Sequence, residues 1–154
     1  MNIVMEKEMA LKELGEFYQE LYQGDELVLD NFVGNPRVVV NSILNGLMKG
    51  YITIMQNEDG DKYFKIKLSK KYNYGSEQNI EEIDMFEPKA KDLNSITLEN
   101  NKVTPFRTSN DIIKKCVLPI KYQSFIDILQ VRDTHYLDGV SVFLTGGLKN
   151  NIPS

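Results

Sequence analysis

The sequence predicts an α+β protein with an N-terminal helical pair, a small antiparallel β-sheet and a C-terminal helical cluster. Apolar residues recur at three- and four-residue steps over residues 1–50, which is typical of amphipathic helices. Over 51–86 they alternate around an Asp-Gly turn, and after residue 87 helical spacing returns. We therefore predict a helical region at 1–50, a sheet-plus-helices domain at 51–147 and a frayed tail at 148–154.

Two helices are predicted before residue 51. The first runs from Glu6 to Gln23, where Gly24 is placed to end it. Its apolar stripe consists of Met9, Leu11, Leu14, Phe17, Tyr18 and Leu21. The second has Asn35 as N-cap and Pro36 at its first helical position, and Gly50 closes it. Its buried stripe consists of Val39, Ile43, Leu44, Leu47 and Met48.

The central region is predicted to form three strands. Residues 51–56 and 62–68 pair as an antiparallel hairpin, since the turn at 57–61 contains Asp-Gly. The return strand places Phe64, Ile66 and Leu68 on one face and Lys65 and Lys67 on the other. The polar stretch 69–79 is predicted to be a loop, and residues 80–86 are predicted to form the third strand (a hairpin plus a third strand in all).

Helical spacing returns in the C-terminal region. One short helix is predicted from Pro88 through Ile96. A second begins at Ser109 or Asn110 as its cap and stops at Pro119. Two more are predicted, over 121–131 and from Asp133 as N-cap, the last with a stripe of Leu137, Val140, Phe143 and Leu144.

Composition and motifs argue against catalysis. The chain has one cysteine, Cys116, and one histidine, His135, which excludes an internal disulfide and a multi-cysteine zinc site. We expect Cys116 to be a buried structural thiol and His135 to be a surface residue. Neither a dinucleotide-binding fingerprint nor a P-loop is present. We therefore expect no enzyme activity, no metal and no cofactor.

The charge pattern bears on nucleic acids and membranes. The net charge of −4 argues against a dedicated duplex-DNA-binding protein. The segment 62–71 differs, because it holds five lysines beside aromatic residues, a pattern that can bind nucleic acid. A solvated strand face that discourages edge-to-edge pairing is the favoured interpretation. Apolar runs are far shorter than the ~20 residues of a membrane span, so no membrane partner is expected.

Three motifs carry a family resemblance over residues 62–144. Leu68-Ser69-Lys70 ends the predicted return strand, and Pro88-Lys89-Ala90-Lys91-Asp92-Leu93 follows the third strand. The C-terminal pattern consists of Asp133, Leu137, Val140, Phe143 and Leu144. In these motifs the chain resembles the tail-assembly chaperones of Mu-like contractile-tailed bacteriophages. Residues 1–50 and the long connection at 98–108 depart from the family pattern.

The resemblance implies a non-catalytic chaperone in the cytoplasm of the host bacterium. Such a protein binds the tape-measure protein until tail-tube subunits replace it, and a homo-oligomer is compatible with that role. An unassembled tape measure exposes amphipathic surface that aggregates, and a helix-in-groove contact can cover it. We place the contact surface on the C-terminal helices, where large apolar residues are abundant: Phe125, Leu129, Tyr136, Leu137 and Phe143.

Two alternative functions remain open. A helix at 36–49 followed by a hairpin at 51–68 also describes a winged-helix-like DNA-binding regulator, with the helix in the major groove and the hairpin as the wing. Its candidate base or phosphate contacts are Arg37, Asn41, Asn45 and Lys49. The other alternative is a structural tail component that remains in the virion.

Overall fold

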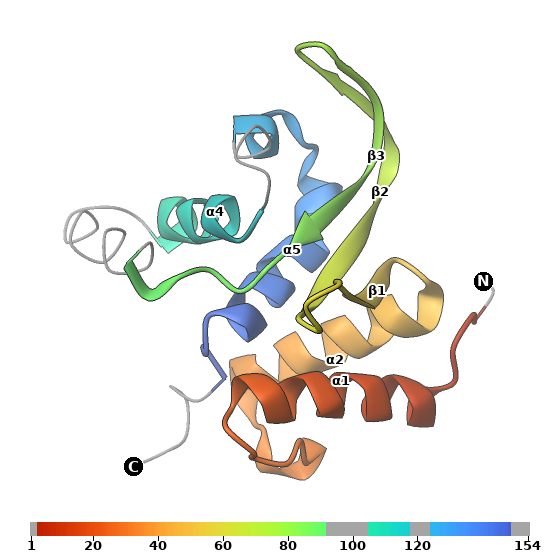
Figure 1. The fold of residues 1–154 in the computed structure, drawn as a ribbon, viewed down its shortest axis with the longest axis vertical. Coiled ribbons are helices and arrows are strands. Elements are labelled where there is room, and N and C mark those ends of the chain that lie inside the picture. The colour runs from red at the N-terminus through yellow and green to blue at the C-terminus, as the bar shows by residue number, and fades with distance from the viewer. Residues whose placement is uncertain (1–2, 92–104, 118–123, 149–154) are drawn as a thin grey trace.

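The computed structural model describes residues 3–91, 105–117 and 124–148 of the 154-residue chain (Figure 1). The elements are α1 (Lys7–Leu21), η1 (Leu29–Asn31), α2 (Gly34–Lys49), β1 (Ile52–Gln56), β2 (Lys62–Tyr74), β3 (Glu77–Met85), α4 (Pro105–Cys116), η3 (Ser124–Ile128) and α5 (Val131–Leu144). The strands form one antiparallel sheet in the order β1-β2-β3. The predicted α+β class is confirmed: helices come before and after the three strands along the sequence.

The N-terminal helices form almost as predicted. Helix α1 runs from Lys7 to Leu21, and α2 ends where Gly50 takes a left-handed conformation. The predicted N-cap of α2 is wrong, because Val33 occupies that position rather than Asn35. The helix therefore begins earlier than expected. Pro36 still lies in the first turn, where its missing N–H costs no helical hydrogen bond.

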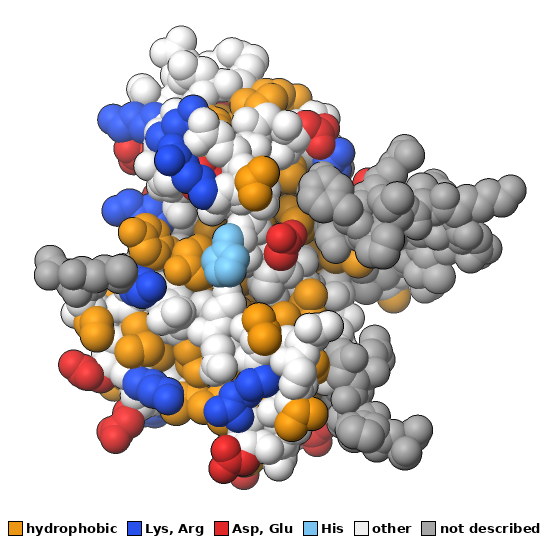
Figure 2. All heavy atoms as spheres, turned by 180° about the vertical axis from the view of Figure 1, so that it is seen from behind, with side chains coloured by type: hydrophobic (Ala, Val, Ile, Leu, Met, Phe, Trp, Pro, Cys, Tyr) orange, Lys and Arg blue, Asp and Glu red, His pale blue; other side chains and the backbone are white. Residues whose placement is uncertain are grey.

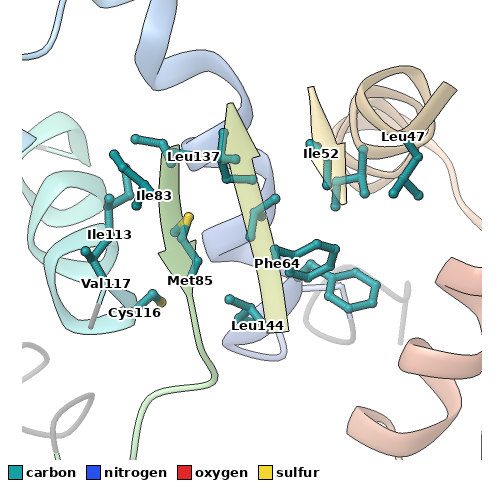
Figure 3. Packing of buried hydrophobic residues seen from close by; sticks show 14 of the residues in the cluster. Leu47, Ile52, Phe64, Ile83, Met85, Ile113, Cys116, Val117, Leu137 and Leu144 are labelled. Atoms are coloured by element: carbon teal, nitrogen blue, oxygen red, sulfur yellow. The ribbon is translucent and has the colours of Figure 1, made fainter. Parts of the chain in front are cut away.

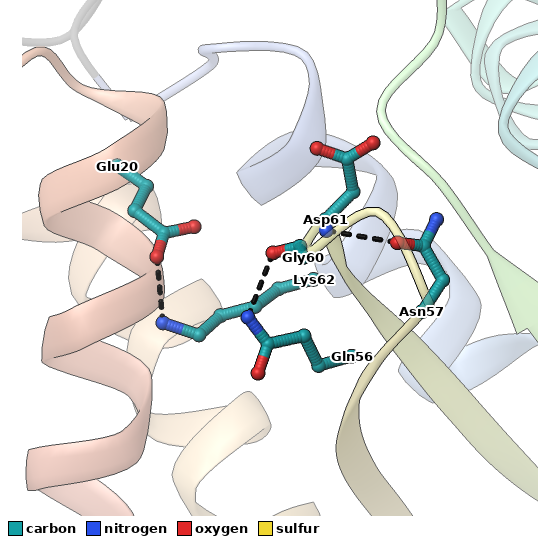
Figure 4. Close-up of polar contacts among 6 residues, drawn as sticks. All are labelled: Glu20, Gln56, Asn57, Gly60, Asp61 and Lys62. Atoms are coloured by element: carbon teal, nitrogen blue, oxygen red, sulfur yellow. Dashed lines mark hydrogen bonds and ion pairs between the residues drawn. The ribbon is translucent and has the colours of Figure 1, made fainter.

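The β1–β2 hairpin has the predicted antiparallel register. Ile52 lies opposite Ile66, and Ile54 lies opposite Phe64. In the turn, the Asn57 side-chain oxygen accepts hydrogen bonds from the N–H groups of Asp59 at 3.0 Å and Asp61 at 2.9 Å (the bond to Asp61 is drawn in Figure 4). Gly60 has a φ of 87°, a conformation that favours glycine, which explains the Asp-Gly signal.

The predicted loop at 69–79 is wrong. Strand β2 continues to Tyr74, and β3 starts at Glu77, so the two strands form a long hairpin that rises past the helices in Figure 1. Tyr72 and Tyr74 both pack edge-on against Phe125, with ring centroids 5.7 Å and 5.8 Å away. This packing stabilises a strand where the polar composition indicated a loop. The register is irregular after Lys67, which breaks the simple alternation.

Two predicted helix starts are corrected in the C-terminal part. Helix α4 begins at Pro105 rather than after a cap at Ser109 or Asn110, since proline is well suited to the first turn. Helix α5 has Gln130 as N-cap, and Asp133 is its third residue. The Asp133 side chain is instead bound by the sheet, as described below.

Two other predicted helices differ in extent or fall outside the description. In the segment 121–131, residues 124–128 form the 3-10 helix η3 instead of an α-helix, and 121–123 lie outside the described residues. The helix predicted over 88–96 lies mostly outside the described residues, as does the predicted stop at Pro119.

One hydrophobic core joins the helical pair, the sheet and the C-terminal helices. Figure 3 shows Ile83 and Met85 of β3 beside Ile113 and Cys116 of α4 and Val117, which follows that helix. Cys116 is fully buried, and this desolvation raises the pKa of its thiol to about 12. The prediction of a buried structural thiol is confirmed.

Aromatic side chains form the centre of the core. The rings of Phe17 in α1 and Phe64 in β2 stack with centroids 4.9 Å apart. Phe143 of α5 packs against both, at 5.5 Å from Phe17 and 5.4 Å from Phe64. The Tyr22 hydroxyl donates a hydrogen bond of 3.0 Å to the backbone oxygen of Phe143. Helix α1 and helix α5 are therefore held together although 121 residues separate this pair.

The C-terminal end of α5 is an ordered cap. Gly146 has a φ of 76°, and the Gly147 N–H donates to the Val142 carbonyl at 2.9 Å, as in a Schellman motif. Leu148 follows and is 2% exposed, and its N–H donates to the Tyr22 hydroxyl at 3.4 Å. Of the tail predicted at 148–154, only Leu148 lies within the described residues.

Candidate partner-binding pocket

The structure places the five predicted contact residues in two groups. Phe125, Leu137 and Phe143 have no exposed surface and belong to the core. Leu129 and Tyr136 are partly buried and pack against the core from outside. Within this fold, Leu129 and Tyr136 are the members of the predicted set that a partner can touch. Tyr136 lines a pocket, so it defines the candidate site.

This pocket has a volume of about 400 Å³ and lies between the start of α5 and β2. Its lining, which we name the Tyr51–Tyr136 pocket, consists of Tyr51, Lys67, Leu68, Ser69, Arg132, Asp133 and Tyr136. The rings of Tyr51 and Tyr136 stack with centroids 5.8 Å apart and an interplanar angle of 22°. Tyr51 is 40% exposed, so the aromatic pair is open to solvent on one side.

His135, the neighbour of Tyr136 on α5, is exposed, and its Nε2 lies 3.3 Å from the Ser42 hydroxyl. The prediction of a surface histidine is confirmed. Figure 2 looks onto a face that carries this single histidine, in pale blue, with apolar side chains around it, basic side chains above it and to its left, and an acidic side chain to its right. The surface around the histidine is therefore mixed in character, with apolar groups next to charges of both signs.

A carboxylate closes the edge of β2 at this pocket. The Lys67 N–H donates to the Tyr51 carbonyl at 2.8 Å, and β1 begins at Ile52, so no strand in the described part of the chain pairs with this edge of β2 beyond that point. The next N–H on that edge, at Ser69, donates to Asp133 Oδ1 at 2.6 Å. Asp133 thus takes the place of a strand carbonyl and satisfies an edge donor.

The second oxygen of Asp133 is also occupied. Asp133 Oδ2 accepts hydrogen bonds from the Ser69 hydroxyl at 2.8 Å and from the Tyr72 hydroxyl. The Tyr72 hydroxyl in turn accepts from the Gln130 N–H at 3.2 Å, at the start of α5. Asp133 is 7% exposed, and these bonds fix the first turn of α5 against β2.

The charge of Asp133 follows from these contacts. Burial raises its pKa, but the hydrogen bonds from Tyr72 and Ser69 and the charge of Arg132 outweigh burial, so its pKa lies below the ordinary value. The pKa of Tyr72 is raised by burial and by its hydrogen bond to Asp133. At neutral pH the pocket therefore holds an ionised carboxylate bound by a neutral phenol.

Most of the lysine-rich segment is paired within the fold. Lys62 Nζ forms an ion pair with Glu20 Oε1 at 2.7 Å, a contact drawn in Figure 4. Lys65 meets Asp84 at 3.1 Å, and Lys71 meets Glu81 at 3.6 Å. Lys70 lies over the Tyr72 ring, 4.9 Å from its centroid. Lys67 and Arg132 are exposed at the pocket, and neither has an ion-pair partner among the described residues.

The residues of the winged-helix alternative lie on α2. The Arg37 guanidinium donates to the Leu29 carbonyl and lies 3.9 Å from Asp30, so it is engaged within the fold. Asn41 and Asn45 are exposed. Nothing in these contacts tests binding to DNA, and the alternative stays a prediction.

Sequence reasoning found Tyr136 but missed Tyr51, Arg132 and the role of Asp133. One signal was available for Arg132: it precedes Tyr136 by four residues on a predicted helix, which places the two on one face. No local pattern links Asp133 to Ser69, because 64 residues separate them.

No family model, curated protein or solved structure matches this chain. Among the described residues, no helix is both long enough and apolar enough to cross a bilayer.

Proposed function

We propose that this protein is a non-catalytic tail-assembly chaperone that binds the tape-measure protein of a phage in the cytoplasm of the host bacterium. Tail-tube subunits are its second proposed partner, since they replace it on the tape measure. The supporting observation is Tyr136, a residue of the predicted contact surface, which lies at the surface in a stacked pair with Tyr51.

The geometry of the pocket suits an anchor side chain from an amphipathic helix. Its volume of about 400 Å³ is at the small end of the range for binding pockets, so it accommodates one or two side chains rather than a whole helix. Stacking already restricts the two tyrosine rings, so little side-chain entropy is lost on binding. Tyrosines held in this way, with part of each side chain open to solvent, are typical of the residues that dominate protein–protein affinity.

Replacing Tyr136 with Asp is expected to weaken binding to the tape-measure protein about thirtyfold, the effect of losing one dominant interface residue. An aspartate removes the ring from the stack and places a charge where an apolar side chain would enter. The measurement is co-purification of a co-expressed tape-measure protein with the tagged chain, followed by an affinity titration of the purified pair.

Val131→Asp is the matched control, because Val131 lies on the same helix, is 86% exposed and does not line the pocket. It should retain the tape measure, and both variants should keep the far-ultraviolet circular dichroism of the wild type. Full retention by Tyr136→Asp would remove this surface from the proposal. Failure of the wild type to capture the tape measure would remove the chaperone function, and presence of the chain in purified virions would favour the structural tail component.

A further inference from the structure

We infer that the Tyr51–Tyr136 pocket recognises an acidic side chain, a Glu or Asp carboxylate that neighbours an apolar residue on a helical segment of the partner. The inference rests on the proposed partner-binding function and adds the chemistry of the segment that is bound. It is carried by the placement of two cations at an aromatic pocket in a chain whose net charge is −4.

The two cations come from different elements. Lys67 belongs to β2 and Arg132 belongs to the first turn of α5, and both line the pocket with exposed side chains. A carboxylate that enters between β2 and α5 can therefore accept hydrogen bonds from both sides, and charge-assisted bonds of this kind are the stronger ones. The methylene groups next to that carboxylate would then lie against the Tyr51 and Tyr136 rings.

The resident carboxylate, Asp133, forms no ion pair with Lys67 or Arg132, although the charge of Arg132 contributes to its lowered pKa. Both oxygens of Asp133 already accept hydrogen bonds, from the Ser69 N–H and hydroxyl and from the Tyr72 hydroxyl. Asp133 is also 7% exposed, so little of its side chain is open to a ligand. With one negative and two positive side chains, the lining keeps a net positive charge.

A single carboxylate fits this arrangement better than a nucleic acid. A polyanion gains affinity from a row of cations along its backbone. Here Lys62, Lys65 and Lys71 are paired with carboxylates of the same chain. The cations without such a partner therefore form only a short row at the pocket and beside it. Two cations are sufficient for one carboxylate, and the overall negative charge does not oppose a partner that is acidic only at its contact residue.

The test uses two synthetic amphipathic helical peptides with the same leucine stripe, one with Glu and one with Gln beside the stripe. The Glu peptide should bind the full chain about tenfold more tightly, since each partly exposed cation–carboxylate pair contributes up to a factor of about five. Binding is followed by backbone amide NMR shifts, which should be largest at Tyr51, Lys67 and Arg132. The double variant Lys67→Gln/Arg132→Gln should bind the two peptides equally.

Lys12→Gln is the matched control, because Lys12 is an exposed lysine on α1 that does not line the pocket, and it should keep the tenfold preference. Equal binding of both peptides by the wild type would overturn the inference, as would an equal loss of preference in the Lys12 control. Tighter binding of a short oligothymidine that is lost in the double variant would overturn it in favour of nucleic acid. None of these results depends on capture of the tape measure. Co-purification tests the proposed function, and the peptide titrations test the chemistry of the pocket, so the two can fail independently.

Discussion

Replacing Phe143 with Ala is expected to lower the free energy of unfolding by about 4 kcal/mol, in the range measured for buried Phe→Ala changes. Phe143 has no exposed surface, and its ring packs against Phe17, Phe64 and Tyr22. Removing the ring leaves a cavity where α1, β2 and α5 meet, and three rigid elements cannot collapse onto it. Urea unfolding followed by circular dichroism measures the change.

Val131→Ala provides the comparison, because Val131 is on the same helix and 86% exposed, and substitutions at such sites change stability by less than about 0.5 kcal/mol. A loss below about 1 kcal/mol for Phe143→Ala would contradict the aromatic centre of the core.

Replacing Asp133 with Ala is expected to cost about 3 kcal/mol of unfolding free energy. The change leaves the Ser69 N–H, the Ser69 hydroxyl and the Tyr72 hydroxyl without their acceptor. A buried donor such as the Tyr72 hydroxyl costs about 1–3 kcal/mol when it is orphaned, and the two donors of exposed Ser69 add smaller amounts. Asp133→Asn keeps the shape and one acceptor oxygen but removes the charge, so its loss should be smaller. Equal stability of wild type and Asp133→Ala would contradict the edge-closing role.

The same residue gives a pH dependence with a definite sign. The pKa of Asp133 is lowered in the folded state, so the folded protein favours the charged form. Its contribution to stability is complete above the ordinary carboxyl pKa of about 4 and is lost as the pH falls through the lower folded value. Wild type should therefore lose more stability than Asp133→Asn between about pH 7 and pH 3, as measured by urea unfolding. An identical loss in both would contradict the lowered pKa.

Local periodicity was sufficient for the elements that bury one continuous face. In α1 the buried residues Leu14, Phe17 and Tyr18 follow helical spacing, and α5 repeats that pattern with Leu137, Val140, Phe143 and Leu144. The β1–β2 hairpin was predictable because Asp59-Gly60 suits a turn in which Gly60 has a positive φ.

The β2–β3 hairpin could not be predicted because its support is distant in sequence. The part of the hairpin near its turn carries exposed Lys70 and Lys71, and the register is irregular between Lys67 and Tyr72. The contacts that stabilise it come from Phe125 and Asp133, which lie more than fifty residues further along the chain. The composition of this segment is dominated by lysines and polar residues, which on their own predict a loop.

The candidate site was predictable only in part, because the sequence indicated the helices that carry it but not which of their residues lie at the surface. Large apolar residues on the C-terminal helices indicated a surface, but size and polarity do not distinguish a core residue from a contact residue. Phe125, Leu137 and Phe143 became core because α1, α4 and the sheet cover them. Tyr136 remained at the surface because its partner is Tyr51, at the exposed start of the sheet.

The bond from Tyr22 to Phe143 also sets an order of events during synthesis. Helix α1 leaves the ribosome early, but one of the rings that cover Phe17 and Tyr22, that of Phe143, belongs to α5, and 121 residues separate Tyr22 from Phe143. Until α5 emerges, the apolar face of α1 has no tertiary cover from that helix. The nascent chain therefore exposes part of this apolar face during synthesis, and a chain truncated before α5 would keep it exposed, as surface of the kind that favours aggregation.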